Sequence, residues 1–196
     1  LETEWGVDAA ASHQDLNGLF KFGLTTNLEL RFANNPFTAD SGTRGFGDTS
    51  LGFKYRFTQD SGYRPSISFM YMLKVPTAGD VLGSGDVDHN LLLLVSKDLG
   101  KHHFDYNLGA MFLGRAGGGC DHALLNALAW SHPLHGQWSV NAELSGVSSP
   151  NSATPGSTQF IAAAIYTARP RLVFDIGMMS RLGGEIPHSM FMAGVT

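Results

Sequence analysis

Alternation between polar and apolar side chains over Gly45–Phe57 (GFGDTSLGFKYRF) is the feature that most constrains this chain. The polar or small positions are Asp48, Ser50, Gly52, Lys54 and Arg56. The positions between them are Thr49, Leu51, Phe53, Tyr55 and Phe57. A period of two predicts a β-strand with two unlike faces. Two folds can use such a strand: a soluble sandwich, with its apolar face in a packed core, or an outer-membrane barrel, with its apolar face towards lipid.

Composition favours the membrane barrel over the soluble sandwich. Only 15% of the 196 residues are charged, 24 are glycine and 11% are aromatic, whereas soluble proteins are usually about 25% charged. The mean hydropathy is −0.04, and no apolar run approaches the roughly 18 residues that a membrane helix needs. The net charge of −4 argues against nucleic acid as a partner. The single cysteine, Cys120, excludes an internal disulfide.

The same alternation recurs along the chain and predicts twelve strands of one all-β domain over residues 1–196. They are predicted at Trp5–Ser12, Leu19–Thr25, Leu28–Ala33, Gly45–Phe57, Ser66–Val75, His89–Leu99, His103–Leu113, His122–Ser131, Trp138–Gly146, Thr158–Thr167, Leu172–Arg181 and Ser189–Val195. The segments QDLNG and NNPFTADSGTR are assigned to connecting loops.

The connections support a transmembrane antiparallel up-and-down β-barrel. Short turns such as TTN, LGK, LHGQ and ARPR alternate with mostly longer loops rich in Gly, Pro, Asn and Ser. Bacterial outer-membrane barrels show this asymmetry, with short periplasmic turns and longer outer loops. Strands of about ten residues also have the length that a tilted strand needs to cross the hydrocarbon layer.

Strand parity assigns the charged side chains to one face, predicted to line the lumen. A lipid-facing Lys or Arg near the bilayer midplane costs about 2–4 kcal/mol of stability. Charged side chains are therefore expected at the alternate positions that face the lumen. Six acidic and six basic residues follow this parity: Asp8, Lys21, Glu29, Arg31, Asp48, Lys54, Arg56, Lys74, Asp105, Glu143, Asp175 and Arg181; Asn141 joins them. Their balance predicts a lumen crossed by ion pairs. Leu51, Phe53, Tyr55, Val140, Ala142, Leu144, Phe174 and Ile176 are predicted to face lipid.

The whole chain resembles the transporter-like outer-membrane barrel family named for the meta-pathway of phenol degradation. The resemblance lies in FGLTTNLELRF (Phe22–Phe32), GFGDTSLGFKYRF (Gly45–Phe57), LKVPTAGD (Leu73–Asp80), WSVNAELSG (Trp138–Gly146), FDIGMMSRL (Phe174–Leu182) and AGVT (Ala193–Thr196). It implies an outer-membrane barrel that passes small apolar or aromatic solutes, and it supplies no catalytic motif. Such barrels usually run on to a terminal aromatic residue, so we expect further residues beyond both ends and a removed leader.

Three other functions are consistent with parts of the sequence. An outer-membrane lipid hydrolase would need Ser, His and an acid together on the rim. Histidines lie at both ends of the predicted strands: His89, His122 and His188 near the loops, and His102, His103, His132 and His135 near the turns. A soluble lipocalin-like binder is disfavoured by the lumen charges and the unequal loops. A structural barrel in an envelope assembly would use the charges only for rigidity.

The prediction from sequence is therefore a non-enzymatic outer-membrane channel. Its partners are membrane lipid and a small-molecule solute, and we expect no catalytic residue, no cofactor and no metal, because no GxSxG elbow and no HExxH or HxxxH spacing is present. Trp5, Tyr55, Phe57, Trp130, Trp138 and Tyr166 are predicted to form an interfacial girdle.

Overall fold

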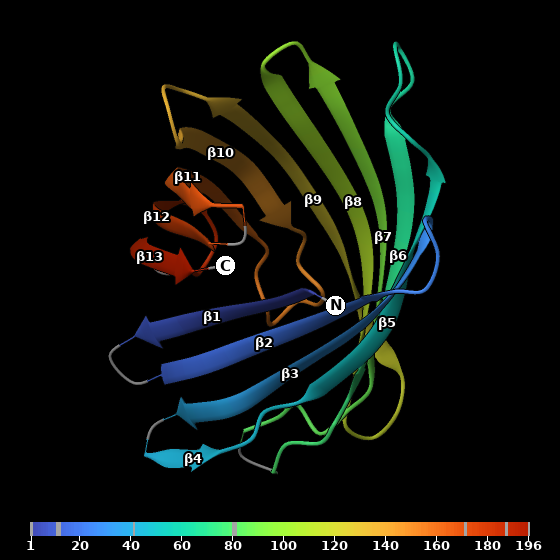
Figure 1. The fold of residues 1–196 in the computed structure, drawn as a ribbon. Coiled ribbons are helices and arrows are strands. Elements are labelled where there is room, and N and C mark those ends of the chain that lie inside the picture. The colour runs from blue at the N-terminus through green and yellow to red at the C-terminus, as the bar shows by residue number, and fades with distance from the viewer. Residues whose placement is uncertain are drawn as a thin grey trace.

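The computed structural model describes residues 2–10, 13–40, 42–79, 82–170, 172–186 and 188–195, with side chains from Leu16 onward except that of Asp40. All regular structure in these ranges is β (Figure 1). The strands are β1 (Glu2–Ala10), β2 (His13–Gly23), β3 (Leu28–Asp40), β4 (Thr43–Gly45), β5 (Thr49–Thr58), β6 (Ser66–Val75), β7 (Asp88–Leu99), β8 (His102–Gly114), β9 (Cys120–Pro133), β10 (Trp138–Val147), β11 (Ser157–Arg169), β12 (Leu172–Gly183) and β13 (Ser189–Val195).

Each long strand pairs antiparallel with the next along the chain, apart from the three-residue β4, which pairs only with β3. β3 continues the ring by pairing with β5. The first and last strands also meet, through the single pair Trp5 and Val195. The pairing order therefore returns to its start, which is the up-and-down antiparallel barrel that the sequence predicts.

The apolar side chains of this barrel lie outside rather than in a core. Large exposed side chains recur on one face of β5, β7, β8, β9, β10 and β12: Leu51, Leu93, Leu108, Leu128, Leu144 and Ile176. Among the described residues, the buried apolar side chains are the small Ala123 and Ala127 together with Met179. In water such a surface would be very costly to expose, at about 25 cal/mol per Å², whereas lipid covers it without that cost.

Connections at the two ends of the barrel differ in length, as predicted. One end carries the turns at 24–27, 59–65, 100–101 and 134–137, and the other carries 115–119 together with the longest connections, between β6 and β7 and at 148–156. Gly100 and Gly136 adopt φ of 65° in two of the short turns, a conformation that costs glycine little. The described part of the chain contains no helix long and apolar enough to cross a membrane.

The first two hairpins differ from the prediction. Residues 14–18 (QDLNG), predicted as a loop, lie inside β2, and residues 34–40 extend β3 rather than starting a loop. Irregular register between Leu16 and Gly18 keeps the paired strands running past these polar residues. Cross-strand pairing thus overrides the local turn preference of Asn17 and Gly18. The other predicted strand ends agree within a few residues.

Candidate functional site

Register places the described in-strand residues of the predicted lumen set on one face of the sheet. Glu29 lies opposite Lys54, and Lys21 lies opposite Arg31. Because side chains alternate between faces, these pairings fix the parity of the neighbouring strands. The residues on this inner face are Lys21, Glu29, Arg31, Lys54, Arg56, Lys74, Asp105, Asn141, Glu143, Asp175 and Arg181. Asp48 precedes β5, and the side chain of Asp8 lies outside the described residues.

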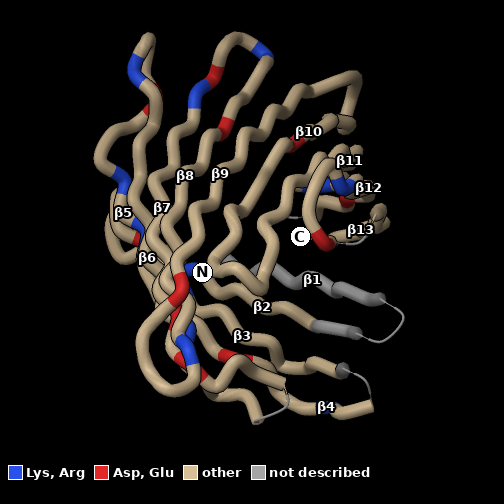
Figure 2. Tube along the Cα trace, turned by 180° about the vertical axis from the view of Figure 1, so that it is seen from behind, with Lys and Arg blue, Asp and Glu red and all other residues tan. Residues whose placement is uncertain are grey.

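Charge on the inner face is unevenly distributed. Figure 2 shows charged positions gathered along β5, β6 and the adjoining loops, while long stretches of β8 and β9 carry none. Of the predicted set, β2, β3 and β5 carry four basic residues and the acidic Glu29, whereas β10 and β12 carry the acidic Glu143 and Asp175 and the basic Arg181. β10 lies across the ring from β3 in pairing order. The two walls therefore differ in net charge.

The charges on β3 and β5 border a hollow near the short-turn end. Arg31 Nε donates to Glu29 Oε1 at 2.7 Å, and Arg56 Nη2 donates to the carbonyl of Thr26 at 2.7 Å. The hollow measures about 230 Å³ and is lined by Glu29, Lys54 and Arg56 together with serine hydroxyl groups of β6 and β7. Polar groups thus cover its wall and can hold water or a polar solute.

The charge balance predicted ion pairs across the lumen, and this prediction is wrong for the ion pairs that the structure describes. Each described ion pair joins groups on the same or adjacent strands and loops. Asp105, for example, lies 3.1 Å from Nε2 of His103 on its own strand. The physical reason is the width of a twelve-stranded ring, which exceeds the interior that side chains alone fill in an eight-stranded barrel.

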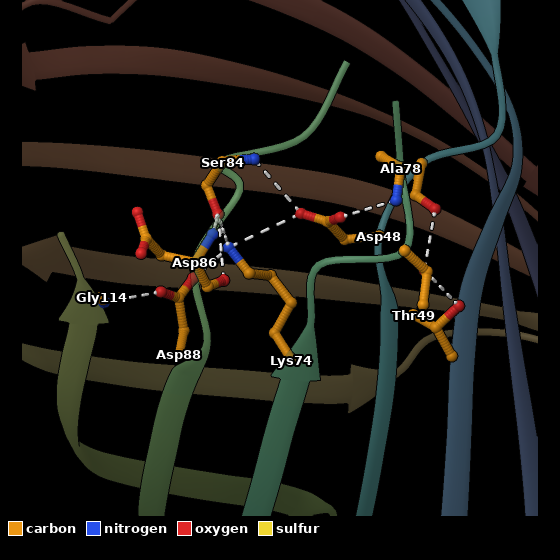
Figure 3. Close-up of polar contacts among 10 residues, drawn as sticks. Asp48, Thr49, Lys74, Ala78, Ser84, Asp86, Asp88 and Gly114 are labelled. Atoms are coloured by element: carbon orange, nitrogen blue, oxygen red, sulfur yellow. Dashed lines mark hydrogen bonds and ion pairs between the residues drawn. The ribbon is translucent and has the colours of Figure 1, made fainter. Parts of the chain in front are cut away.

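A second charged group lies at the long-loop end, where the inner face meets the loop 76–87 (Figure 3). Lys74 Nζ lies 2.5 Å from Asp88 Oδ2 and 3.6 Å from Asp48 Oδ2. Lys74 also donates to the hydroxyl of Ser84. Asp48 accepts hydrogen bonds from the amides of Ala78 at 3.1 Å and Ser84 at 3.3 Å. These contacts, which we call the loop latch, tie both sides of the loop to the barrel wall.

The loop latch brings part of the loop onto the inner face. A hollow of about 290 Å³ is lined by Leu82, Gly83 and Ser84 from the loop and by Ser50 and Lys74 from the wall. Asp88, only 9% exposed, supports this arrangement by accepting a hydrogen bond from the amide of Gly114 at 2.9 Å. Residues 82–84 of the loop therefore lie against the inner face at this end of the barrel.

Asp88 and Ser84 were missed by the sequence prediction. Asp88 stands just before His89, where the predicted strand began, and it has the same parity as Asn90 and the inner-face Leu92. Extending the alternation of β7 by one residue would have placed it opposite Lys74. Ser84 has no sequence signal, because its position depends on how the loop folds.

The described histidines make their hydrogen bonds and ion pairs with groups other than serine hydroxyls. Tyr71 and His89 are hydrogen bonded at 2.7 Å, and Trp130 Nε1 donates to His102 at 3.0 Å. Within the described residues, no serine hydroxyl is hydrogen bonded to a histidine ring. The same residues contain no group of three or more His, Cys, Asp or Glu arranged to hold a metal ion.

Aromatic rings gather on the outer face at the short-turn end. Trp130 and His132 stack with an interplanar angle of 9°, and Trp138 lies 4.9 Å from Tyr166 between ring centroids. Tyr55 and Phe57 make a further edge contact. Amphipathic rings in this position suit the boundary between lipid and water.

Comparison with known proteins agrees with this architecture. The family model described as "Putative MetA-pathway of phenol degradation" matches residues 2–185. The NanC porin is similar in structure, with a TM-score of 0.71, 10% identity and coverage of 99% of this chain and 98% of that one. The COG4313 outer membrane channel from Pseudomonas putida F1 has a TM-score of 0.69 and 14% identity, covering 98% and 91%.

An anion-selective porin from Comamonas acidovorans is also similar, with a TM-score of 0.50 and 14% identity over 91% of this chain and 57% of that one. No curated protein matches the sequence. At these identities the solved structures show a shared barrel fold and nothing about solutes.

Proposed function

This chain belongs to the family described as putative MetA-pathway of phenol degradation, and we propose that it forms a channel in the bacterial outer membrane through which small solutes diffuse. The observation that carries the proposal is the inner face itself. Polar and charged side chains border hollows near both ends of the barrel, in place of the packed apolar side chains that would fill a closed core. Water-filled barrels place polar groups inside and apolar groups outside in this way.

The arrangement of charges on the inner face favours a channel for small solutes rather than a barrel with a purely structural role. A structural barrel gains most when opposite charges pair, because an unpaired charge away from water is costly. In the described contacts Glu143 makes no ion pair, although basic groups stand across the ring. A carboxylate in this position remains hydrated, which a water-containing lumen permits.

We propose that the solutes are small and largely apolar, aromatic compounds among them. The middle of the inner wall from β7 to β9 supports this class, because residues such as Leu92 and Leu125 leave it weakly polar where β3 and β5 carry charge. A solute with an apolar body and one polar group would contact both kinds of wall. We further propose that the protein acts without catalysis.

Proteoliposome swelling tests this function. Vesicles that contain the refolded protein are diluted into isosmotic glycerol, arabinose or a trisaccharide, and light scattering reports entry. We expect swelling with the small probes and little swelling with the trisaccharide. Vesicles with folded protein that swell with none of the probes would contradict an open, water-filled path through the barrel.

A further inference from the structure

Methionine is concentrated on the inner face of the barrel. The sequence contains seven methionines. Parity places Met178 outside and the others inside: Met70, Met72, Met111, Met179, Met190 and Met192. Lipid would accept methionine on the outer face equally well, so barrel folding alone does not account for this distribution. Methionine is flexible and polarizable, and it adapts to ligands of varied shape and to aromatic rings.

Some of these methionines border a hollow in the wall that runs from β3 to β9. Its volume is about 310 Å³, and it is lined by residues that include Ser50, Met72, Asn90, Leu92, Met111 and Leu125. Register explains the grouping, because Asn90 lies opposite both Met72 and Met111, and Gly109 lies opposite both Leu92 and Leu125. We call this hollow the methionine pocket.

Glycines shape the methionine pocket. A Cβ atom at Gly109 would lie 3.3 Å from Leu125 Cβ and 3.4 Å from Leu92 Cγ. A Cβ atom at Gly52 would overlap Met72 Sδ. The two glycines therefore leave space that larger residues would fill, and they allow Met72 to lie across the adjacent strand.

The methionine pocket lies between the two polar hollows. Ser50 lines both this pocket and the hollow at the loop latch. Further along β5, Lys54 lines the hollow at the short-turn end. A solute that moves along this wall thus leaves a charged region, meets an apolar one and then meets charge again. Few polar groups face the pocket, and Asn90 and Ser50 are the hydrogen-bonding side chains among its lining residues.

We propose that the methionine pocket binds an uncharged solute with a compact apolar body, such as a single aromatic ring, and one hydroxyl group. The ring lies against Met72, Met111 and Leu125, and the hydroxyl group hydrogen bonds to the Asn90 amide or the Ser50 hydroxyl. This inference rests on the proposed function, since it names a stopping point on the proposed path. Binding is weak, because conduction requires that a solute also leaves.

Methyl NMR with 4-fluorophenol as the probe tests this site. The full chain is labelled at its methionine methyl groups with carbon-13 and refolded in detergent micelles. An aromatic ring shifts the resonance of a methyl group that it contacts. We expect saturable shifts at Met72 and Met111, assigned through Met72→Leu and Met111→Leu. Met178, on the outer face, reports partition of the probe into the micelle and should change only linearly.

A pair of variants separates the pocket from the rest of the lumen. Leu92→Gln adds a polar group to the pocket wall. It should raise the Kd read from the saturable shift about tenfold. Ile161→Gln also replaces an aliphatic side chain with glutamine on the inner face, but on β11. It should leave the Kd of the probe unchanged. Chemical shifts that change linearly and equally at Met72 and Met178 as the probe is added would overturn the site. An equal rise in Kd in both variants would overturn it as well.

Failure of this site and failure of the proposed function give different results. Saturable binding at Met72 in a protein that swells no vesicles would support the pocket and exclude the channel. Swelling with glycerol combined with no saturable shift would exclude the pocket and leave the channel.

Discussion

Lys74 at the end of β6 and Asp88 at the start of β7 form an ion pair of 2.5 Å across adjacent strands, at the point where the loop 76–87 leaves and rejoins the barrel. Lys74 reaches Ser84 of the loop from the same position, and Asp48 binds two amides of the loop. A few charged side chains thus hold Ala78 and Ser84, on the two sides of this loop, against the barrel wall.

Removing the Asp88 charge should release the loop latch. Asp88→Asn leaves Lys74 with the more distant Asp48, and loss of one charged hydrogen-bond partner costs about 1–3 kcal/mol of folding stability. We expect a lower urea midpoint for the folded band on unboiled gels. Arg115→Gln is the control, because Arg115 is 59% exposed in its pair with Asp121 and should contribute little. Equal shifts for both variants would contradict the latch.

Adjacent positions on β10 should tolerate arginine very differently. Val140 lies on the outer face and Asn141 on the inner face. Val140→Arg should cost more folding free energy than Asn141→Arg, because an outward arginine is placed against lipid whereas an inward one meets the lumen. The fraction of protein that folds into lipid vesicles, read from heat-modifiable gel migration, measures the difference. Equal folding of both variants would reverse the assignment of the faces.

Gly52 should not accept even a methyl group without loss of stability. Its added Cβ atom would overlap the carbonyl oxygen of Tyr71 on the paired strand, so backbone must move. Overpacking of this kind typically costs about 1–3 kcal/mol. Gly23→Ala is the matched control, since a Cβ atom there has no neighbour within 4 Å. Urea titration of both variants in micelles should show a lower midpoint for Gly52→Ala alone.

Acid should loosen the turn at 59–65. Lys97 Nζ lies 2.5 Å from Asp60 Oδ1, and the Asp98 amide donates to Asp60 Oδ2 at 2.8 Å. The hydrogen bond from Lys97, followed by that from the Asp98 amide, lowers the pKa of Asp60. The stabilisation is therefore present above the ordinary carboxyl pKa of about 3.9 and is lost as pH falls through the lowered value.

Amide hydrogen exchange at Asp98 measures this loss. Its protection should fall as the pH is lowered through the acid range, after correction for intrinsic exchange. Asp60→Asn should remove that pH dependence. Protection that changes with pH in the same way in both proteins would contradict the assignment.

Strand parity was readable from sequence because both faces of this barrel have consistent surroundings. Leu51 and Lys54, for example, had to differ in polarity, since one faces outward and the other lines a hollow. The course of β2 past Asn17 was not readable, because pairing with β1 and β3 outweighs the preference of Asn-Gly for a turn.

The alternation of residues also could not predict which side chains on the inner face contact one another. Charge balance indicated pairs across the lumen, yet Lys74 pairs with Asp88 on the next strand. The methionine pocket depends on Gly52 and Gly109 lying beside Met72 and Leu92, and these neighbours are set by the exact register between consecutive strands. Sequence patterns fix which face a residue occupies, whereas register fixes its partners.

Planar-bilayer recording tests the central claim most directly, with the wild type and the variants Lys54→Gln and Glu143→Gln. Lys54 and Glu143 lie on opposite walls and carry opposite charges, so their removal should change the field in the pore in opposite directions. The channel account predicts steady conductance in the wild type, greater cation preference in Lys54→Gln and smaller cation preference in Glu143→Gln. Folded wild-type protein that inserts without conductance, or conductance with the same ion preference in all three proteins, would contradict it.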